Sequence, residues 1–430
     1  MHPLQEIVQK QKQGIAEGIC SVCSSSPFVI DAAILQAKKT GTEVLIEATA
    51  NQVNQHGGYT GMKPADFRDY VLGRAEALGL PAEKVILGGD HLGPVAWKKQ
   101  PADEAMDLAE ELVYEFAKAG YSKIHLDASM PLGDEVTLTT EEIADRTVRL
   151  CRASEKAFDR EREMKPVYVI GSEVPTPGGS GDEDELSVTR PDALLEMLDC
   201  FRDKFEEAGL ADAWSRVVAA VVQPGVEFGN SNIHEYVPAE AEELSRTAKG
   251  LQNIVLEGHS TDYQCESSLR KMVEDGIAIL KVGPALTFAA REALFALSRM
   301  EEDMDNLEML KRPFSDFEET LDGAMLAAPG NWQGHYTDVE PESTFMRKYS
   351  LSDRSRYYMH RPEVKEKLDA MFSNLEDAGI PLTMLSQYMP VQYEHVREGV
   401  IDTDQSGLPE ALVIDKVQEV LSKYWRACGK

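Results

Sequence analysis

The chain has 430 residues, of which 43% are hydrophobic and 27% charged, as is typical of a water-soluble globular protein. Asp and Glu outnumber Lys and Arg by 74 to 44, and a formal charge of −30 would repel a phosphate backbone, so we exclude nucleic acid as a partner. No apolar run approaches the roughly 18 residues of a membrane span, and the N-terminus lacks a secretory signal pattern. We therefore expect a cytoplasmic protein that has no membrane partner.

Eight short apolar runs, rich in β-branched residues, follow one another along the chain, and amphipathic helical stretches separate them. They begin near residues 18, 43, 84, 123, 168, 217, 253 and 278. Gly120 provides a typical helix stop before the fourth run. Eight strands, with a helix between each pair and one after the last, predict a (β/α)8 TIM barrel. A doubly wound open sheet is the weaker alternative, because the Gly-rich phosphate turn that usually opens it is absent.

The strand rhythm stops near residue 300, and helical and loop patterns replace it. We expect a barrel over residues 1–300 and a helical C-terminal extension, packed on the barrel, over residues 301–430. A helix is predicted over residues 300–326. The aromatic-rich stretches at 350–358 and 386–395 are predicted to pack the extension against the barrel. The alternative is that Arg354, Arg356 or Tyr358 reaches the active site.

The six cysteines are too sparse for a disulfide framework, so we predict reduced and mostly buried thiols. Cys20 and Cys23 form a CxxC pair within the first predicted strand. No second such pair and no paired histidines follow at the spacing of a zinc site, which favours a structural role for both.

Working residues in a TIM barrel stand at the C-terminal ends of the strands, and in this sequence those positions are unusually polar. A carboxylate or imidazole in an apolar barrel rim is costly unless it is paired, hydrogen-bonded or bound to a cation, so the cluster predicts a functional site. The strand-end residues are Glu47, Asp90, His91, His125, Asp127, Glu173, Gln223, Glu227, Glu257, His259 and Lys281.

His91 and His259, with one or both of Glu173 and Glu257, form a candidate site for a divalent metal such as Zn, Mn, Co or Ni. Asp90, beside His91, is the candidate general acid or base. Its competitors for proton transfer are Asp127 and Glu47, and Glu173 is a further catalytic candidate. The predicted substrate-binding residues are Glu47, Gln55, His125, Ser129, Gln223, Ser260, Asp262 and Lys281.

Two segments near the last two strands, residues 258–262 and 281–284, lie where barrels often hold a phosphate. Both segments are also consistent with simple turns. Lys281 would be the cationic contact for the phosphate, with a Schiff-base lysine as the less favoured alternative.

Several long blocks of this sequence resemble the tagatose-bisphosphate aldolase subunit Z family, the GatZ/KbaZ type, over nearly the whole chain. They include LIEATANQVNQHGGYTGMKPADF, LGGDHLGP, YVIGSEVPTPGG, VVQPGVEF, ILKVGPALTFAAREALFAL and SLSDRSRYY. The resemblance implies a class II aldolase-like barrel and a role in galactitol, tagatose or N-acetylgalactosamine catabolism. Some members of this family are described as non-catalytic subunits of a partner class II aldolase, and others as metal-dependent C4 epimerases that interconvert tagatose and fructose or their 6-phosphates.

Asp90 and His91 match the strand-3 Asp-His pair of catalytic class II aldolases, and residues 173–179 resemble their Glu-bearing, double-Gly loop. Two positions depart from those enzymes. Where they carry metal-binding histidines after strand 6 and on strand 7, this chain has Gln223 and Glu257, and His259 is displaced by two residues. The comparison therefore implies a remodelled His/Glu metal site in place of the standard three-histidine site.

The favoured function is a metal-dependent C4 epimerase acting on a ketose or ketose phosphate by retro-aldol cleavage and re-formation of the C3–C4 bond. Cleavage places negative charge at C3, where the C2 carbonyl and a metal delocalise it. The alternative route removes the proton from C4 and returns it, but a ketone at C2 does not make that proton acidic. The alternative is an accessory subunit of a class II tagatose-1,6-bisphosphate aldolase. A sugar-phosphate kinase is disfavoured because the sequence has no P-loop and no kinase Gly-rich motif. We also expect a homo-oligomer.

Overall fold

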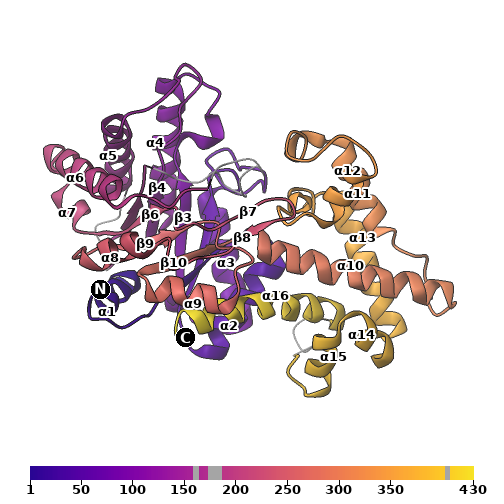
Figure 1. Ribbon diagram of the computed structural model, residues 1–430. Coiled ribbons are helices and arrows are strands. Elements are labelled where there is room, and N and C mark those ends of the chain that lie inside the picture. The colour runs from indigo at the N-terminus through magenta and orange to yellow at the C-terminus, as the bar shows by residue number, and fades with distance from the viewer. Residues whose placement is uncertain (158–163, 173–185, 402–406) are drawn as a thin grey trace.

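The computed structural model describes residues 1–157, 164–172, 186–401 and 407–430. Eight parallel strands close into a barrel in the order β1-β10-β9-β6-β5-β4-β3-β2 (Figure 1), which confirms the predicted (β/α)8 fold. Each of the eight predicted runs overlaps one barrel strand. The strands are β1 Ile19–Cys23, β2 Val44–Thr49, β3 Val85–Leu92, β4 Lys123–Leu126, β5 Val167–Ile170, β6 Val217–Val222, β9 Val255–Gly258 and β10 Ile277–Val282.

Helices follow the strands and surround the barrel: α2 Pro27–Thr40, α3 Pro64–Leu78, α4 Ala102–Ala119, α5 Thr140–Ala157, α6 Pro191–Glu207, α7 Ala211–Trp214, α8 Glu242–Gly250, α9 Glu266–Glu274 and α10 Pro284–Asn306. Proline occupies the start of α2, α3, α6 and α10, where its missing N–H costs no helical hydrogen bond. Gly120 ends α4 with φ of 97°, a left-handed conformation that favours glycine, so the helix stop predicted there is confirmed.

An N-terminal helix, α1 Pro3–Lys12, closes one end of the barrel. Its residues Leu4, Ile7 and Val8 belong to a buried apolar cluster with inward-facing strand residues such as Leu45 and Ile279. This cluster fills the part of the barrel nearest α1, and Asp90, His91 and His259 lie toward the opposite end. That end is formed by the C-termini of the strands, where a TIM barrel carries its site.

The C-terminal helices lie mostly to one side of the barrel, at the end of the long helix α10 (Figure 1). They are α11 Phe317–Ala327, α12 Glu342–Tyr349, α13 Pro362–Ala378, α14 Leu382–Tyr388, α15 Pro390–Arg397 and α16 Leu408–Ala427. The last of them, α16, returns to the barrel and contacts α2, α9 and β1. The boundary expected at residue 300 falls inside α10, which is continuous through Asn306.

The helix predicted over residues 300–326 is two helices, because the chain leaves the helical conformation after Asn306 and re-enters it at Phe317. Pro313 lies in the break, and Glu308 and Asp316 have positive φ values of 57° and 59°. Proline lacks an N–H and restricts the residue before it, so this segment does not continue a helix.

A short hairpin, formed by β7 Glu227–Phe228 and β8 Ile233–His234, extends from the barrel toward the C-terminal helices (Figure 1). At its turn, the Asn230 carbonyl accepts a hydrogen bond from the Leu351 N–H at 2.9 Å, and the Asn230 side chain bonds Ser350 and Ser352. The hairpin therefore ties the segment at 350–352 to the barrel.

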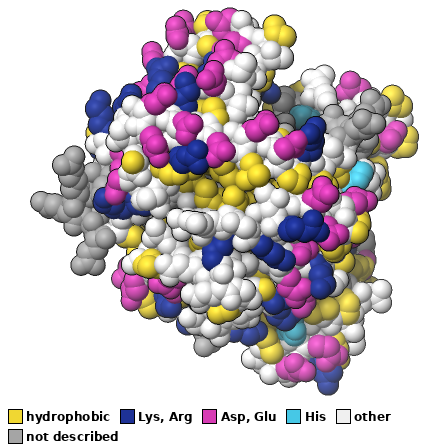
Figure 2. All heavy atoms as spheres, turned by 60° about the vertical axis from the view of Figure 1, so that its left-hand side comes forward, with side chains coloured by type: hydrophobic (Ala, Val, Ile, Leu, Met, Phe, Trp, Pro, Cys, Tyr) yellow, Lys and Arg dark blue, Asp and Glu magenta, His cyan; other side chains and the backbone are white. Residues whose placement is uncertain are grey.

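Acidic and basic side chains are interspersed over one face of the molecule, with a group of hydrophobic side chains near its centre (Figure 2). Among the described residues, no helix is both long enough and apolar enough to cross a membrane.

Candidate functional site

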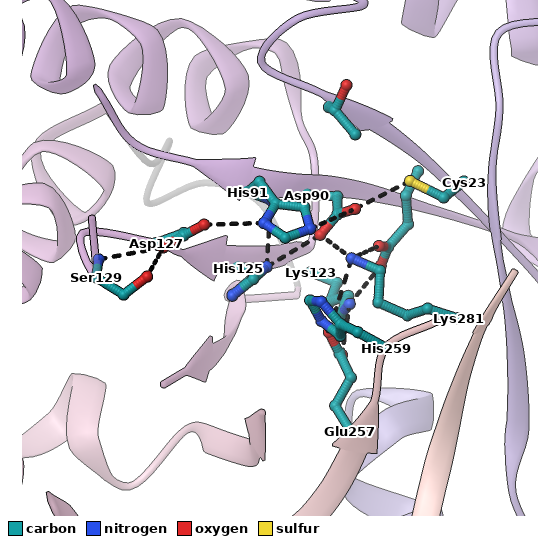
Figure 3. Close-up of polar contacts among 12 residues, drawn as sticks. Cys23, Asp90, His91, Lys123, His125, Asp127, Ser129, Glu257, His259 and Lys281 are labelled. Atoms are coloured by element: carbon teal, nitrogen blue, oxygen red, sulfur yellow. Dashed lines mark hydrogen bonds and ion pairs between the residues drawn. The ribbon is translucent and has the colours of Figure 1, made fainter. Parts of the chain in front are cut away.

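Three histidines and one aspartate meet inside the C-terminal end of the barrel (Figure 3). Asp90 and His91 come from β3, His125 from β4, and His259 follows β9. One ligand atom from each of the four lies within 4.8 Å of the others. The imidazole centroids are 4.9 to 5.3 Å apart. All four residues are buried, so the sequence expectation of a polar cluster at the strand ends holds for these positions.

Asp90 and His91 are neighbours in one strand, and in regular β structure their side chains would point to opposite faces. The pairing of β3 with β4 shifts register between Gly89 and Leu92, and His91 has φ of 46°. This irregularity allows both side chains to reach the site. A non-glycine residue in the left-handed region costs about 1 to 2 kcal/mol, which the surrounding contacts must offset.

Each of the three imidazoles has one ring nitrogen against a carboxylate. The pairs are His91 Nδ1 with Asp127 at 2.8 Å, His125 Nδ1 with Asp90 at 3.0 Å and His259 Nε2 with Glu257 at 2.9 Å. Such a contact orients a ring and leaves its second nitrogen for a metal ion, and it is the usual environment of metal-binding histidines.

The residues fit a divalent cation. His125 Nε2 is fully buried and has no hydrogen-bond partner among the described residues, which is costly for a polar atom unless a ligand binds it. Burial lowers the pKa of His125 and of His259 to about 4, so both rings are neutral near pH 7, as metal ligation requires. Histidine nitrogens with an adjacent carboxylate suit Zn, Mn, Co or Ni.

A buried ion-pair group lies next to the histidines in the barrel interior. Lys123 Nζ, from the start of β4, is 2.5 Å from Glu47 and 2.7 Å from Glu257, and all three side chains are 0% exposed. Burial opposes the charge on Lys123, but the carboxylates of Glu257 and Glu47 outweigh it and raise its pKa. Glu257 therefore joins Lys123 to His259.

Glu257 is predicted from the sequence as a metal ligand and His125 as a substrate-binding residue, and Lys123 is not among the predicted site residues. In the structure His125 belongs to the four-residue cluster, while Glu257 contacts Lys123 and His259. The resemblance to class II aldolases implied a His/Glu site in place of three histidines. In the structure three imidazoles do come together, and His125 is the third. Lys123, His125 and Asp127 are two residues apart along the chain, so their side chains face the same side of the sheet. This spacing would have identified Lys123 as an interior residue.

Asp90 is the carboxylate of this group that also faces open space. It accepts a hydrogen bond from the Cys23 thiol at 3.0 Å, contacts the Lys281 ammonium and lines a cavity of about 610 Å³. Asp127 and Glu47 do not line this cavity. Asp127 is held by His91 and by the hydroxyl and N–H of Ser129. Of the three carboxylates proposed for proton transfer, Asp90 is therefore the one placed to meet a ligand.

Lys281 and Cys23 form the wall beside Asp90. Burial lowers the pKa of Lys281, whose ammonium also lies 3.6 Å from Glu47 and 3.9 Å from Glu257. Burial raises the pKa of the Cys23 thiol to about 12, so it stays protonated and donates to Asp90.

Barrel residues and the C-terminal segment line the cavity together. Asp90, His91, His259, Ser260, Asp262 and Lys281 line it from the barrel. Arg356 and Tyr357 line it from the C-terminal side. Arg354 instead donates to the Asn331 carbonyl at 2.9 Å, and the Tyr358 hydroxyl donates to the Ala328 carbonyl at 2.6 Å. Of the three residues considered at 354–358, Arg356 is at the cavity and the other two make packing contacts.

Asp262 occupies the N-terminus of α10. One of its carboxylate oxygens accepts hydrogen bonds from the N–H groups of Gly283 and Ala285, at 3.0 and 2.8 Å. Burial raises the pKa of Asp262 to about 6. The Asp262 carboxylate thus joins the two segments, 258–262 and 281–284, in which the sequence suggested a phosphate site.

Other predicted residues lie apart from the cluster. The Gln55 amide donates to the Leu108 carbonyl at 3.0 Å, and the Gln223 side chain accepts from the N–H groups of Gly225 and Val226. Neither glutamine lines the cavity. Glu173 lies outside the described residues, so its predicted catalytic and metal-binding roles stay predictions.

The chain matches one protein family over nearly its whole length. The model of the D-tagatose-1,6-bisphosphate aldolase subunit GatZ/KbaZ-like family matches residues 4–429. Proteins named D-tagatose-1,6-bisphosphate aldolase subunit GatZ, from Salmonella paratyphi B and Salmonella typhimurium, are each 46% identical over 99% of both chains. A crystal structure from Sinorhizobium meliloti, described as a probable tagatose 6 phosphate kinase, is 44% identical, covers 96% of this chain and 100% of its own, and has a TM-score of 0.86. This chain belongs to the D-tagatose-1,6-bisphosphate aldolase subunit GatZ/KbaZ-like family.

Proposed function

We propose that this chain breaks and re-forms the C3–C4 bond of a tagatose-type ketose, free or phosphorylated, and thereby acts as a C4 epimerase. The observation that carries the proposal is the convergence of Asp90, His91, His125 and His259 beside a cavity, with one buried imidazole nitrogen left without a partner among the described residues. Burying such groups is costly, and a role in chemistry is the simplest reason to keep them.

The metal would be held by His91, His125 and His259, with Asp90 within reach. When bound, a divalent cation supplies Lewis acidity that polarises the ketose carbonyl and stabilises negative charge on the fragment that contains it. The protein contributes the orientation of the three rings through Asp127, Asp90 and Glu257.

Asp90 is the proposed acid and base. It takes the proton from the C4 hydroxyl while the electrons of the C3–C4 bond move to C3, leaving an aldehyde at C4 and an enediolate. If the aldehyde group rotates and presents its other face before the bond re-forms, C3 attacks that face. Asp90 then returns the proton to the C4 oxygen. Atoms and electrons balance, and no other reactant is consumed.

A second candidate is an accessory subunit of a tagatose-1,6-bisphosphate aldolase. The names of the Salmonella relatives, at 46% identity over 99% of the chain, favour it. Under this proposal the partner is a class II aldolase, and the metal cluster serves stability or the binding of a sugar. The description of the Sinorhizobium meliloti protein as a probable kinase finds no support in this sequence, which lacks a P-loop.

The test is to assay the purified chain alone after chelation, and again with Mn, Co, Ni or Zn, on tagatose, tagatose 6-phosphate and tagatose 1,6-bisphosphate. The epimerase proposal expects the fructose counterpart of one of these sugars, formed only when metal is present. Absence of turnover on all three, together with increased activity of an added class II aldolase, would refute it and support the subunit proposal.

A further inference from the structure

The C-terminal segment brings a positive charge into the cavity wall that the proposed chemistry does not use. We propose that Arg356 binds an anionic group at one end of the substrate, a phosphate or a carboxylate, and so selects charged ketoses over neutral ones. The identity of the ligand as a ketose rests on the proposed function. The anion site itself rests on the surroundings of Arg356.

The described hydrogen-bond acceptors of Arg356 are all neutral oxygen atoms. Its guanidinium donates to the carbonyl oxygens of Ser352 and Asp353 and, at 2.9 Å, to the Tyr357 hydroxyl. It also lies over the Tyr357 ring, 4.4 Å from the centroid. No described carboxylate forms an ion pair with it. Because removing a charge from bulk water without a direct ion-pair partner is unfavourable, this arrangement favours an anionic ligand in the cavity.

The nearest described carboxylate on the same segment is already engaged. Asp353 accepts from Arg291 Nε at 2.9 Å, from the Thr287 hydroxyl at 2.5 Å and from the Ser355 hydroxyl at 2.9 Å. Arg291 and Asp353 therefore compensate each other's charge. Asp353 and Asp262, which lines the same cavity, also act on Arg356 electrostatically, but neither forms an ion pair with it. These contacts also fasten the segment to α10.

The backbone fixes where Arg356 lies. Asp353 has φ of 42° and precedes a single 3₁₀ turn at Arg354–Tyr357. Arg354 and Arg356 in this turn have different environments, one bound to Asn331 and the other at the cavity. The side chain of Arg356 is thus held before any ligand binds, which lowers the entropy cost of recognition.

The other place where an anion could bind is filled. At the N-terminus of α10, the Asp262 carboxylate accepts from Gly283 and Ala285, so a phosphate there would meet a negative charge. The planar guanidinium of Arg356 can instead bind two oxygens of a phosphate or carboxylate at once. Hydroxyl groups of Ser24, Ser25 and Tyr59 line the same cavity and offer further donors.

The test is calorimetric binding of tagatose, tagatose 6-phosphate and the C6-carboxylate analogue to the metal-free full chain and to Arg356→Gln, Arg356→Lys and Arg354→Gln. Arg354→Gln is the matched control, because it alters the same turn away from the cavity. We expect the wild type and this control to prefer one of the charged sugars over tagatose. Arg356→Gln should lower the affinity for that sugar about 10- to 100-fold, the usual effect of losing a charged hydrogen-bonded contact. Its affinity for tagatose should be unchanged.

Arg356→Lys keeps the charge but loses the planar fork, so it should retain part of the preference. It also guards against the case in which Arg356→Gln does not fold. The charged sugar that shows the Arg356-dependent preference identifies the anion as phosphate or carboxylate. The proposal is overturned if the wild type prefers neither charged sugar, if both Arg356 variants keep the full preference, or if they lose neutral and charged sugars equally. Because binding is measured without metal or turnover, the result stands apart from that of the epimerase assay.

Discussion

His91 and Asp127 are joined by a contact of 2.8 Å between Nδ1 and Oδ2, although His91 lies within a register shift in β3 and Asp127 lies after β4. The other Asp127 oxygen accepts from both the N–H and the hydroxyl of Ser129. The carboxylate is thus fixed on two sides, and it fixes the imidazole in turn. This pair links the local distortion of β3 to the capacity of the cluster to bind a metal.

Replacing Asp127 by Asn should lower the affinity for the divalent metal about 10- to 100-fold, because the amide orients the ring less firmly and leaves it less basic. Competition with a coloured chelator measures this. Asp103→Asn, on the exposed surface of α4, is the control. An unchanged affinity in Asp127→Asn would mean that His91 is not a ligand or needs no support.

Removing His125 should abolish stabilisation by metal. A ligand that binds only the folded state at 100 times its dissociation constant adds about 2.7 kcal/mol, so the midpoint of thermal unfolding should rise when Mn, Co, Ni or Zn is added to the chelated wild type. His125→Asn should lose this rise, and His234→Asn, in the exposed hairpin, should keep it. A full rise in His125→Asn would exclude His125 from the metal site.

Lys123→Met should destabilise the fold by about 3 kcal/mol in urea unfolding, since it leaves Glu47 and Glu257 buried without their closest counter-charge. Adding Glu47→Gln to this variant removes one of the uncompensated charges and should restore part of the loss. A cost below about 1 kcal/mol for Lys123→Met alone would show that Lys281, 3.6 and 3.9 Å from the two carboxylates, suffices as the counter-charge.

Asp262 should make stability depend on pH. Burial raises its pKa in the folded state to about 6, above the ordinary value, so the protonated form favours folding at low pH and this contribution is lost as pH rises through 6. Asp262→Asn mimics the protonated form. It should be more stable than the wild type by about 1 to 3 kcal/mol at pH 7.5, and the difference should vanish near pH 4. Equal stability of the two proteins at both pH values would contradict a raised pKa of Asp262 in the folded protein.

The barrel could be predicted because each strand is a compact apolar run, and the rim could be predicted because Asp90, His91 and His259 end such runs. Lys123 was missed because it begins its run instead of ending it. The joint approach of Asp90 and His91 to His125 depends on the register shift at β3, which follows from no local pattern. Arg356 reaches the cavity through contacts of Asp353 with α10, more than sixty residues away in sequence, and a sequence pattern does not encode such a contact.

We propose that this chain alone, loaded with a divalent metal, epimerises a ketose at C4 through cleavage of the C3–C4 bond. The most direct measurement is nuclear magnetic resonance of the sugar during incubation with the metal-loaded chain in deuterium oxide. We predict that tagatose or its 6-phosphate converts to the fructose counterpart and keeps its original hydrogen at C4, because cleavage never breaks the C4–H bond. Deuterium at C4 would indicate proton transfer instead, and the absence of any product without an added class II aldolase would contradict the enzyme account altogether.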